Sequence, residues 1–90
     1  MNVFYLKMYY TDYKEEHKLL GTNVFLSLDD AIEYSVNKAK RVLEPYSLYG
    51  DVFDFTAVIC HARITSKGIV PDDEVFRKQY NYNDFDYDYE

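Results

Sequence analysis

The sequence predicts a small α+β domain in which a three-stranded, mainly antiparallel sheet carries one helix on one of its faces. Ninety residues suit a single domain. Three segments alternate apolar and polar residues as strands do, and one segment has the period of a helix. We expect the order β-β-α-β over residues 1–70, followed by a C-terminal segment, residues 71–90, that holds a short helix or loop and an acidic tail.

The first two strands are expected to form a hairpin. In residues 2–11, successive side chains point to opposite faces of the sheet. One face would carry Phe4, Leu6 and Met8, and the other would carry Val3, Tyr5, Lys7 and Tyr9. Residues 19–26 are rich in β-branched and aromatic residues and would pair back across the polar connection 12–18.

The helix is expected over residues 27–44. Ser27 can cap its start, acidic residues follow in the first turns, and Lys38, Lys40 and Arg41 lie near its end, where the helix dipole favours cations. Pro45 ends it. One apolar stripe recurs at steps of three and four, formed by Leu28, Ala31, Ile32, Ser35, Val36, Ala39, Val42 and Leu43.

The third strand, residues 52–65, is apolar on both faces at its middle, which indicates an interior position in the sheet. Residues 66–68 predict a turn. Residues 69–79 are expected to form a short segment that becomes helical at Pro71 or Asp72.

One helix covers only one face of a sheet. Tyr5, Lys7 and Tyr9 would lie on the other face, which is typical of an interaction surface. The C-terminal segment, a second copy of the chain in a homodimer, or a different protein would cover it.

Catalytic, metal and cofactor sites are not expected. Cys60 and His61 are neighbours in a strand, so their side chains point to opposite faces and cannot act as a nucleophile and base pair. His17 lies in an acidic loop, and two histidines with one cysteine do not supply the four ligands of a structural zinc. We therefore predict a protein that is not an enzyme.

Composition bears on partners and compartment. The net charge of −6 and the pI of about 4.8 disfavour direct binding of nucleic acid, which needs clustered cations. The sequence contains no long apolar run for a membrane helix and no signal peptide at its start, and its single cysteine fits a reducing compartment. A cytoplasmic location without membrane contact is expected.

The acidity is concentrated at the C-terminus. Residues 1–70 hold nine acids and eight bases, a balance of −1, whereas residues 71–90 hold seven acids and two bases, a balance of −5. Acids alternate there with aromatic residues, and the candidate partner-binding residues are Tyr80, Tyr82, Asp84, Phe85, Asp86, Tyr87, Asp88, Tyr89 and Glu90. Such a segment suits a basic, aromatic-lined groove in a partner, although a solvated, frayed terminus has the same composition.

This tail resembles the acidic tails of bacterial single-stranded-DNA-binding proteins, which recruit partners. In size, acidity and tyrosine content the chain is similar to small bacteriophage-encoded proteins for host takeover or anti-defence. That resemblance implies a non-enzymatic, protein-binding inhibitor or modulator in the host cytoplasm, acting as a nucleic-acid mimic on a host nucleic-acid-processing protein. The segment "SLDDAIEYSVNKA" also resembles HicB-type antitoxins, which implies the alternative of a dimeric regulatory or structural interaction module.

Overall fold

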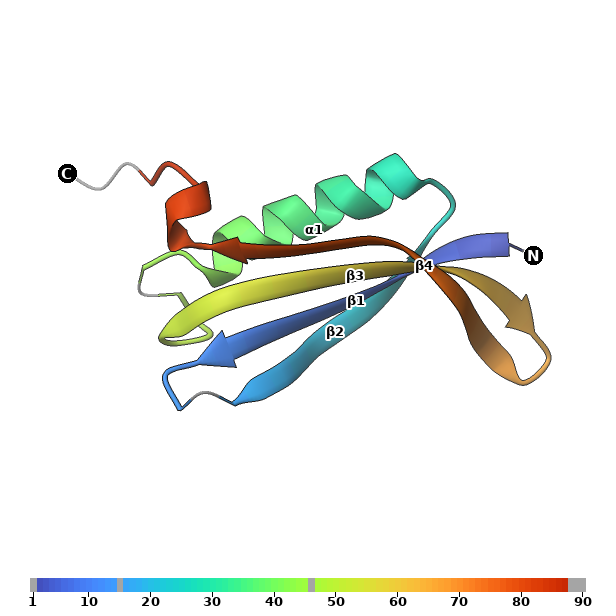
Figure 1. Ribbon diagram of the computed structural model, residues 1–90, viewed down its shortest axis with the longest axis horizontal. Coiled ribbons are helices and arrows are strands. Elements are labelled where there is room, and N and C mark those ends of the chain that lie inside the picture. Colours follow the sequence, from blue (N-terminus) through green and yellow to red (C-terminus); the bar gives the residue numbers. More distant parts are fainter. Residues whose placement is uncertain (1, 15, 46, 88–90) are drawn as a thin grey trace.

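The computed structural model describes residues 2–14, 16–45 and 47–87. Its elements are β1 (Asn2–Asp12), β2 (His17–Phe25), α1 (Leu28–Val42), β3 (Val52–Thr65), β4 (Gly68–Asn81) and the short 3-10 helix η1 (Tyr82–Asp84). The strands form one antiparallel sheet in the order β2-β1-β3-β4, and α1 lies along one face of it (Figure 1).

The prediction of a three-stranded sheet was wrong, because residues 68–81 form a fourth strand where a short helix or loop was expected. This segment contains Pro71, Asp72, Asp73 and Glu74, which are poor strand formers. Proline is tolerated because β4 lies at the edge of the sheet. Two register shifts opposite β3 also break its alternation of apolar and polar residues. The strand forms because β3 pairs with it over nearly its whole length.

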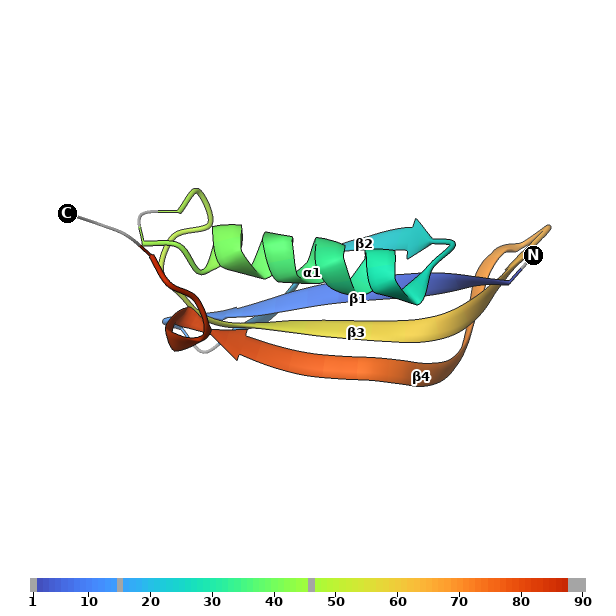
Figure 2. The same cartoon turned by 90° about the horizontal axis from the view of Figure 1, so that it is seen from above.

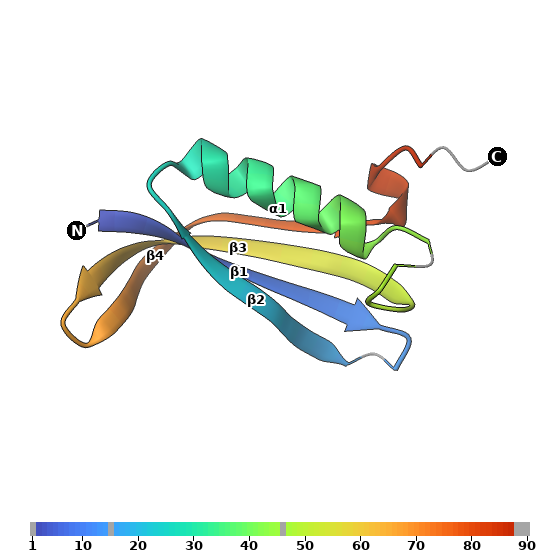
Figure 3. The same ribbon diagram turned by 180° about the vertical axis from the view of Figure 1, so that it is seen from behind.

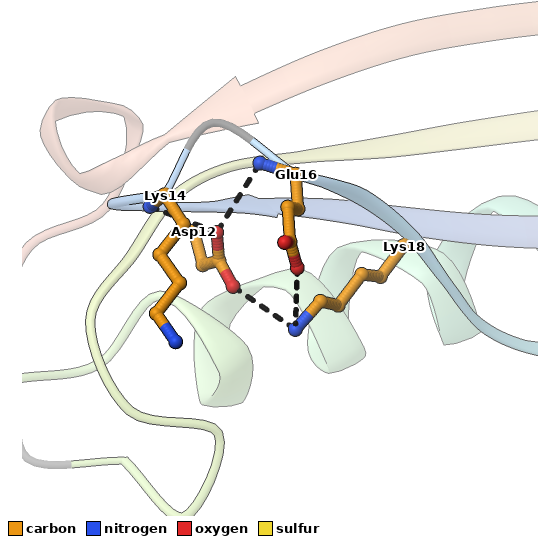
Figure 4. A network of polar contacts seen from close by, with 4 residues as sticks. All are labelled: Asp12, Lys14, Glu16 and Lys18. Atoms are coloured by element: carbon orange, nitrogen blue, oxygen red, sulfur yellow. Dashed lines mark hydrogen bonds and ion pairs between the residues drawn. The ribbon is translucent and has the colours of Figure 1, made fainter.

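The predicted hairpin of the first two strands is confirmed, and its turn is tighter than expected. The Oδ1 atom of Asp12 accepts backbone hydrogen bonds from Lys14 at 3.0 Å and Glu16 at 3.3 Å. The ammonium of Lys18 lies 3.1 Å from the Asp12 carboxylate and 3.3 Å from that of Glu16 (Figure 4). This turn extends β1 to Asp12 and starts β2 at His17.

The predicted helix is also confirmed, with its end two residues earlier. The Ser27 hydroxyl accepts a hydrogen bond from the Asp30 amide at 3.4 Å, and the amide of Leu43 closes the helix by donating to Ala39 at 2.9 Å. The predicted apolar stripe faces the sheet. Its buried members are Ala31, Ser35, Ala39, Val42 and Leu43.

The main core lies between α1 and the sheet (Figures 2 and 3). Phe55, Leu6 and Ile59 are fully buried there. They come from β1 and β3, the two interior strands, which confirms the interior position predicted for residues 52–65. Within the described residues no helix covers the second face of the sheet, which we call the open face.

Candidate functional site

Tyr80, the first residue of the predicted tail site, lies in β4 as part of the core. Its side chain is only 4% exposed, and its ring centroid is 6.3 Å from that of Phe55. The buried side chain of Ser35 in α1 lies beside its hydroxyl. Burial raises the pKa of this hydroxyl, and the Asp84 carboxylate adds to the effect, while Ser35 opposes it. Tyr80 therefore joins the edge strand to the helix and is not available to a partner.

After β4 the chain turns back toward the helix. The side chain of Asn81 accepts a hydrogen bond from the Asn83 amide at 3.0 Å, and the Asp84 carboxylate accepts one from the Asn81 amide at 2.7 Å. These reciprocal bonds form a capping box that starts η1. The turn brings Phe85 back onto Tyr80, with ring centroids 5.8 Å apart.

Tyr87 fastens the described part of the tail to the end of α1. Its hydroxyl donates a 2.6 Å hydrogen bond to the backbone carbonyl of Lys40, and its ring stacks on Tyr82 at 5.1 Å. Burial raises the pKa of Tyr87, helped by the Glu44 carboxylate and by Tyr82. Three predicted site residues, Asp88, Tyr89 and Glu90, lie outside the described residues.

The structure brings other segments to the same end of the molecule as η1. Figure 1 shows the turn between β1 and β2 and the loop between α1 and β3 there. A hollow of about 370 Å³ lies between them, lined in part by Tyr13, Glu44, Asp51, Phe53 and Tyr82. We define the acidic aromatic end as these five lining residues together with Asp84 and Asp86, two exposed acids that follow Tyr82 in the chain and do not themselves line the hollow.

The aromatic rings of this surface are open to solvent. Tyr13, Phe53 and Tyr82 are 62%, 45% and 46% exposed. Tyr13 meets Phe53 edge-on with ring centroids 4.2 Å apart. Gly50 shapes the preceding loop with a φ of 82°, a conformation that glycine adopts without strain. That turn is followed by Asp51, which directly precedes Val52, the first residue of β3, and lies two positions before Phe53.

This combination of groups is suited to long cationic side chains. An arginine guanidinium stacks on aromatic faces and pairs with carboxylates, and both kinds of group line the hollow. No ion pair within the described residues joins Asp51 or Asp86 to a cation. Their charges therefore remain available to a partner.

The other predicted surface residues, Tyr5, Lys7 and Tyr9, lie together on the open face. The ammonium of Lys7 is 5.6 Å from the ring centroid of Tyr5, and Tyr9 stacks on His17 at 4.9 Å. The described tail residues pack on the helix side of the sheet, through Phe85 and Tyr87. Covering of the open face by the C-terminal segment, one of the three alternatives expected from the sequence, is therefore not found in the part of the chain that the structure describes.

Cys60 and His61 do point to opposite faces of the sheet. Cys60 is buried on the open face, whereas the exposed His61 ring lies 5.2 Å from Phe4 on the helix side. Among the described residues no three histidine, cysteine or acidic side chains are grouped to hold a metal ion. None of the described helices is long and apolar enough to span a membrane.

No protein-family model matches the chain, and no curated protein or solved structure matches it either. Tyr13, Glu44, Asp51 and Phe53 were missed as site residues because they are scattered along the sequence. The exposed tyrosine in the polar stretch 12–18 was the only local signal.

Proposed function

We propose that the chain is a non-enzymatic, protein-binding inhibitor or modulator that uses its acidic aromatic end to bind the basic site of a nucleic-acid-processing protein. The observation that carries the proposal is the hollow in which exposed Tyr13, Phe53 and Tyr82 rings lie beside carboxylates. Carboxylates would take the place of phosphates, and flat rings would take the place of bases.

The described part of the tail would not bind a partner as a free peptide, because it is attached to the folded domain. Phe85 and Tyr87 pack against their own chain, so they hold η1 and its carboxylates in position. A preorganised surface loses less conformational entropy on binding than a disordered tail does. The partner would meet Tyr82, Asp84 and Asp86 together with Tyr13 and Phe53.

Charge and rings would contribute differently to such a complex. Exposed carboxylates chiefly accelerate association with a basic surface, and their effect decreases as salt screens them. Aromatic side chains buried at an interface chiefly slow dissociation. The proposed location is the cytoplasm, where such partners act.

The test compares two variants in which three acidic residues are replaced by amides, so that both have the same net charge. The first, E44Q/D51N/D86N, alters the acidic aromatic end. The second, D29N/E33Q/D73N, alters exposed acids elsewhere on α1 and β4 and is the matched control. Each tagged protein is used to capture basic nucleic-acid-binding proteins from a bacterial lysate, and the bound proteins are then challenged with single-stranded and double-stranded oligonucleotides.

We expect the wild type and the control variant to retain a partner that oligonucleotides displace, and the first variant to lose it. A partner that binds all three proteins equally and is not displaced by either oligonucleotide would contradict the proposal. A Y13A/F53A variant tests the rings separately, and its complex should dissociate faster while association is little changed.

A further inference from the structure

The open face has a groove along β3. Its volume is about 690 Å³, and Thr56, Val58 and Cys60 of β3 form its floor. Lys7 and Tyr9 of β1, with His17 of β2, line one side. Glu74, Arg77 and Gln79 of β4 line the other. The groove forms because the short side chains of β3 lie between longer side chains of β1 and β2 on one side and of β4 on the other.

A ridge runs beside this groove. Tyr5, Lys7 and Tyr9 alternate along β1 on the open face, and β1 is the strand next to β3. Tyr5 is in register with Cys60, and Lys7 is in register with Val58. Adjacent strands lie about 4.8 Å apart, so the ridge and the groove are parallel neighbours.

We propose that this face binds a second copy of the chain in a symmetric dimer. A two-fold axis parallel to the strands, between β1 and β3, places the ridge of each copy over the groove of the other. Such an interface is isologous and closes on itself. Two sheets packed face to face interdigitate in this way at a separation of about 10 Å.

The charges of the face favour a second copy as its occupant. The chain carries a net charge of −6, whereas the charged residues that line the groove of the open face are Lys7, Arg77 and Lys78 against Glu74, so this face does not share the acidity of the chain. Arg77 pairs with Glu74 at 2.8 Å within the chain. Copies approaching through this face therefore avoid the repulsion expected between other parts of two acidic proteins.

The proposed arrangement also provides a contact between opposite charges. Lys7 of one copy would lie over Val58 of the other, and Glu74 pairs with Cys60, two positions further along β3. The Lys7 ammonium would then lie within reach of the other copy's Glu74. Tyr5 would cover the other copy's Cys60, which is already largely buried.

The area of the face is sufficient for a stable dimer. Eleven positions of β1 at about 3.3 Å per residue and four strands at about 4.8 Å spacing give roughly 700 Å² per chain. Two such faces approach the size of a standard specific interface, about 1,600 Å² in total. The dimer does not depend on the proposed function, and its axis would place both acidic aromatic ends at the same end of the assembly.

Sedimentation equilibrium of the full chain from about 1 to 200 μM, the range of micromolar affinities, tests the proposal directly. We expect the wild type to approach twice its mass of 10.8 kDa. The Y5S/Y9S variant removes the rings of the ridge and should raise the dissociation constant at least about tenfold, as loss of a central aromatic contact does. The matched control Y34S/Y49S removes two half-exposed tyrosines outside the open face and should leave the constant unchanged.

A second pair of variants tests the same interface without changing the tyrosines. Lys7→Glu would bring like charges together across the interface and should also weaken the dimer, with an unchanged circular dichroism spectrum. Lys14→Glu makes the same charge change in the β1–β2 turn and should have no effect. A wild type of 10.8 kDa throughout, or a dimer that Lys7→Glu and Lys14→Glu affect equally, would overturn the proposal.

Discussion

The hydroxyl of Tyr87 donates a 2.6 Å hydrogen bond to the carbonyl of Lys40, 47 positions earlier in the chain. The last carbonyl groups of a helix have no partner within the helix, so this bond satisfies one of them. It also holds the end of the described tail against α1. The acidic C-terminus is therefore part of the folded surface as far as Tyr87.

Removing this hydroxyl should weaken the attachment of the tail. Tyr87→Phe keeps the ring that stacks on Tyr82 but loses the hydrogen bond, which is worth about 0.5–1.5 kcal/mol of the free energy of unfolding. Urea denaturation measures the change. Tyr82→Phe is the control, because no hydrogen bond of its hydroxyl is found in the described structure, and an equal loss in both variants would argue against the contact.

Alkaline pH should destabilise the same region. Burial raises the pKa of Tyr80 and Tyr87 above the usual 10.0. As pH rises, these hydroxyls therefore lose their protons at a lower pH in the unfolded chain than in the folded chain. The stability that these groups contribute is present below about pH 10 and is lost as pH rises through their folded pKa values. A titration followed by tyrosinate absorbance should show late-titrating groups, with one fewer in Tyr87→Phe. Simultaneous ionisation of all tyrosines would contradict this.

Two neighbouring phenylalanines should differ sharply in their effect on stability. Phe55 is fully buried, so Phe55→Ala should cost about 3–5 kcal/mol in the free energy of unfolding, from lost burial and the cavity left behind. Phe53 is 45% exposed in the acidic aromatic end, and Phe53→Ala should cost about 1 kcal/mol or less. Thermal and urea unfolding of both variants measure the difference. Similar costs would contradict the burial of Phe55 and the exposure of Phe53.

The groups of the β1–β2 turn that bond to the Asp12 carboxylate should respond together when this carboxylate is protonated. Desolvation acts to raise the pKa of Asp12, but the hydrogen bonds from Lys18 and from the amides of Glu16 and Lys14 outweigh it and lower the pKa below 3.8. The stability from this ionised carboxylate is present above about pH 3.8 and is lost as pH falls through the folded pKa. In an NMR titration, the Lys14 and Glu16 amides should shift with the Asp12 midpoint. Lys18→Met should move that midpoint upward; an unchanged midpoint would exclude the ion pair as a cause.

The helix and the first three strands could be predicted because their sequence patterns are local. The caps and the apolar stripe of α1 lie within residues 27–44. The alternation of side chains between two faces in β1 and β3 can be recognised without knowing which strand pairs with them. Residues 68–81 lack such a pattern, since acidic residues, Pro71 and two register shifts interrupt it. Their conformation depends on pairing with β3, so a prediction from local propensity failed there.

The sequence by itself determined the position of the helix, the first three strands, the concentration of acid at the C-terminus and the aromatic residues between the acids. Only the tertiary structure decided how those aromatics are used, because burial depends on contacts between distant segments. Tyr80 enters the core and Tyr87 binds the end of α1, while Tyr82 remains exposed beside Tyr13 and Phe53. Charge is a property of composition, but a binding surface is assembled by long-range packing of a β-sheet and a helix.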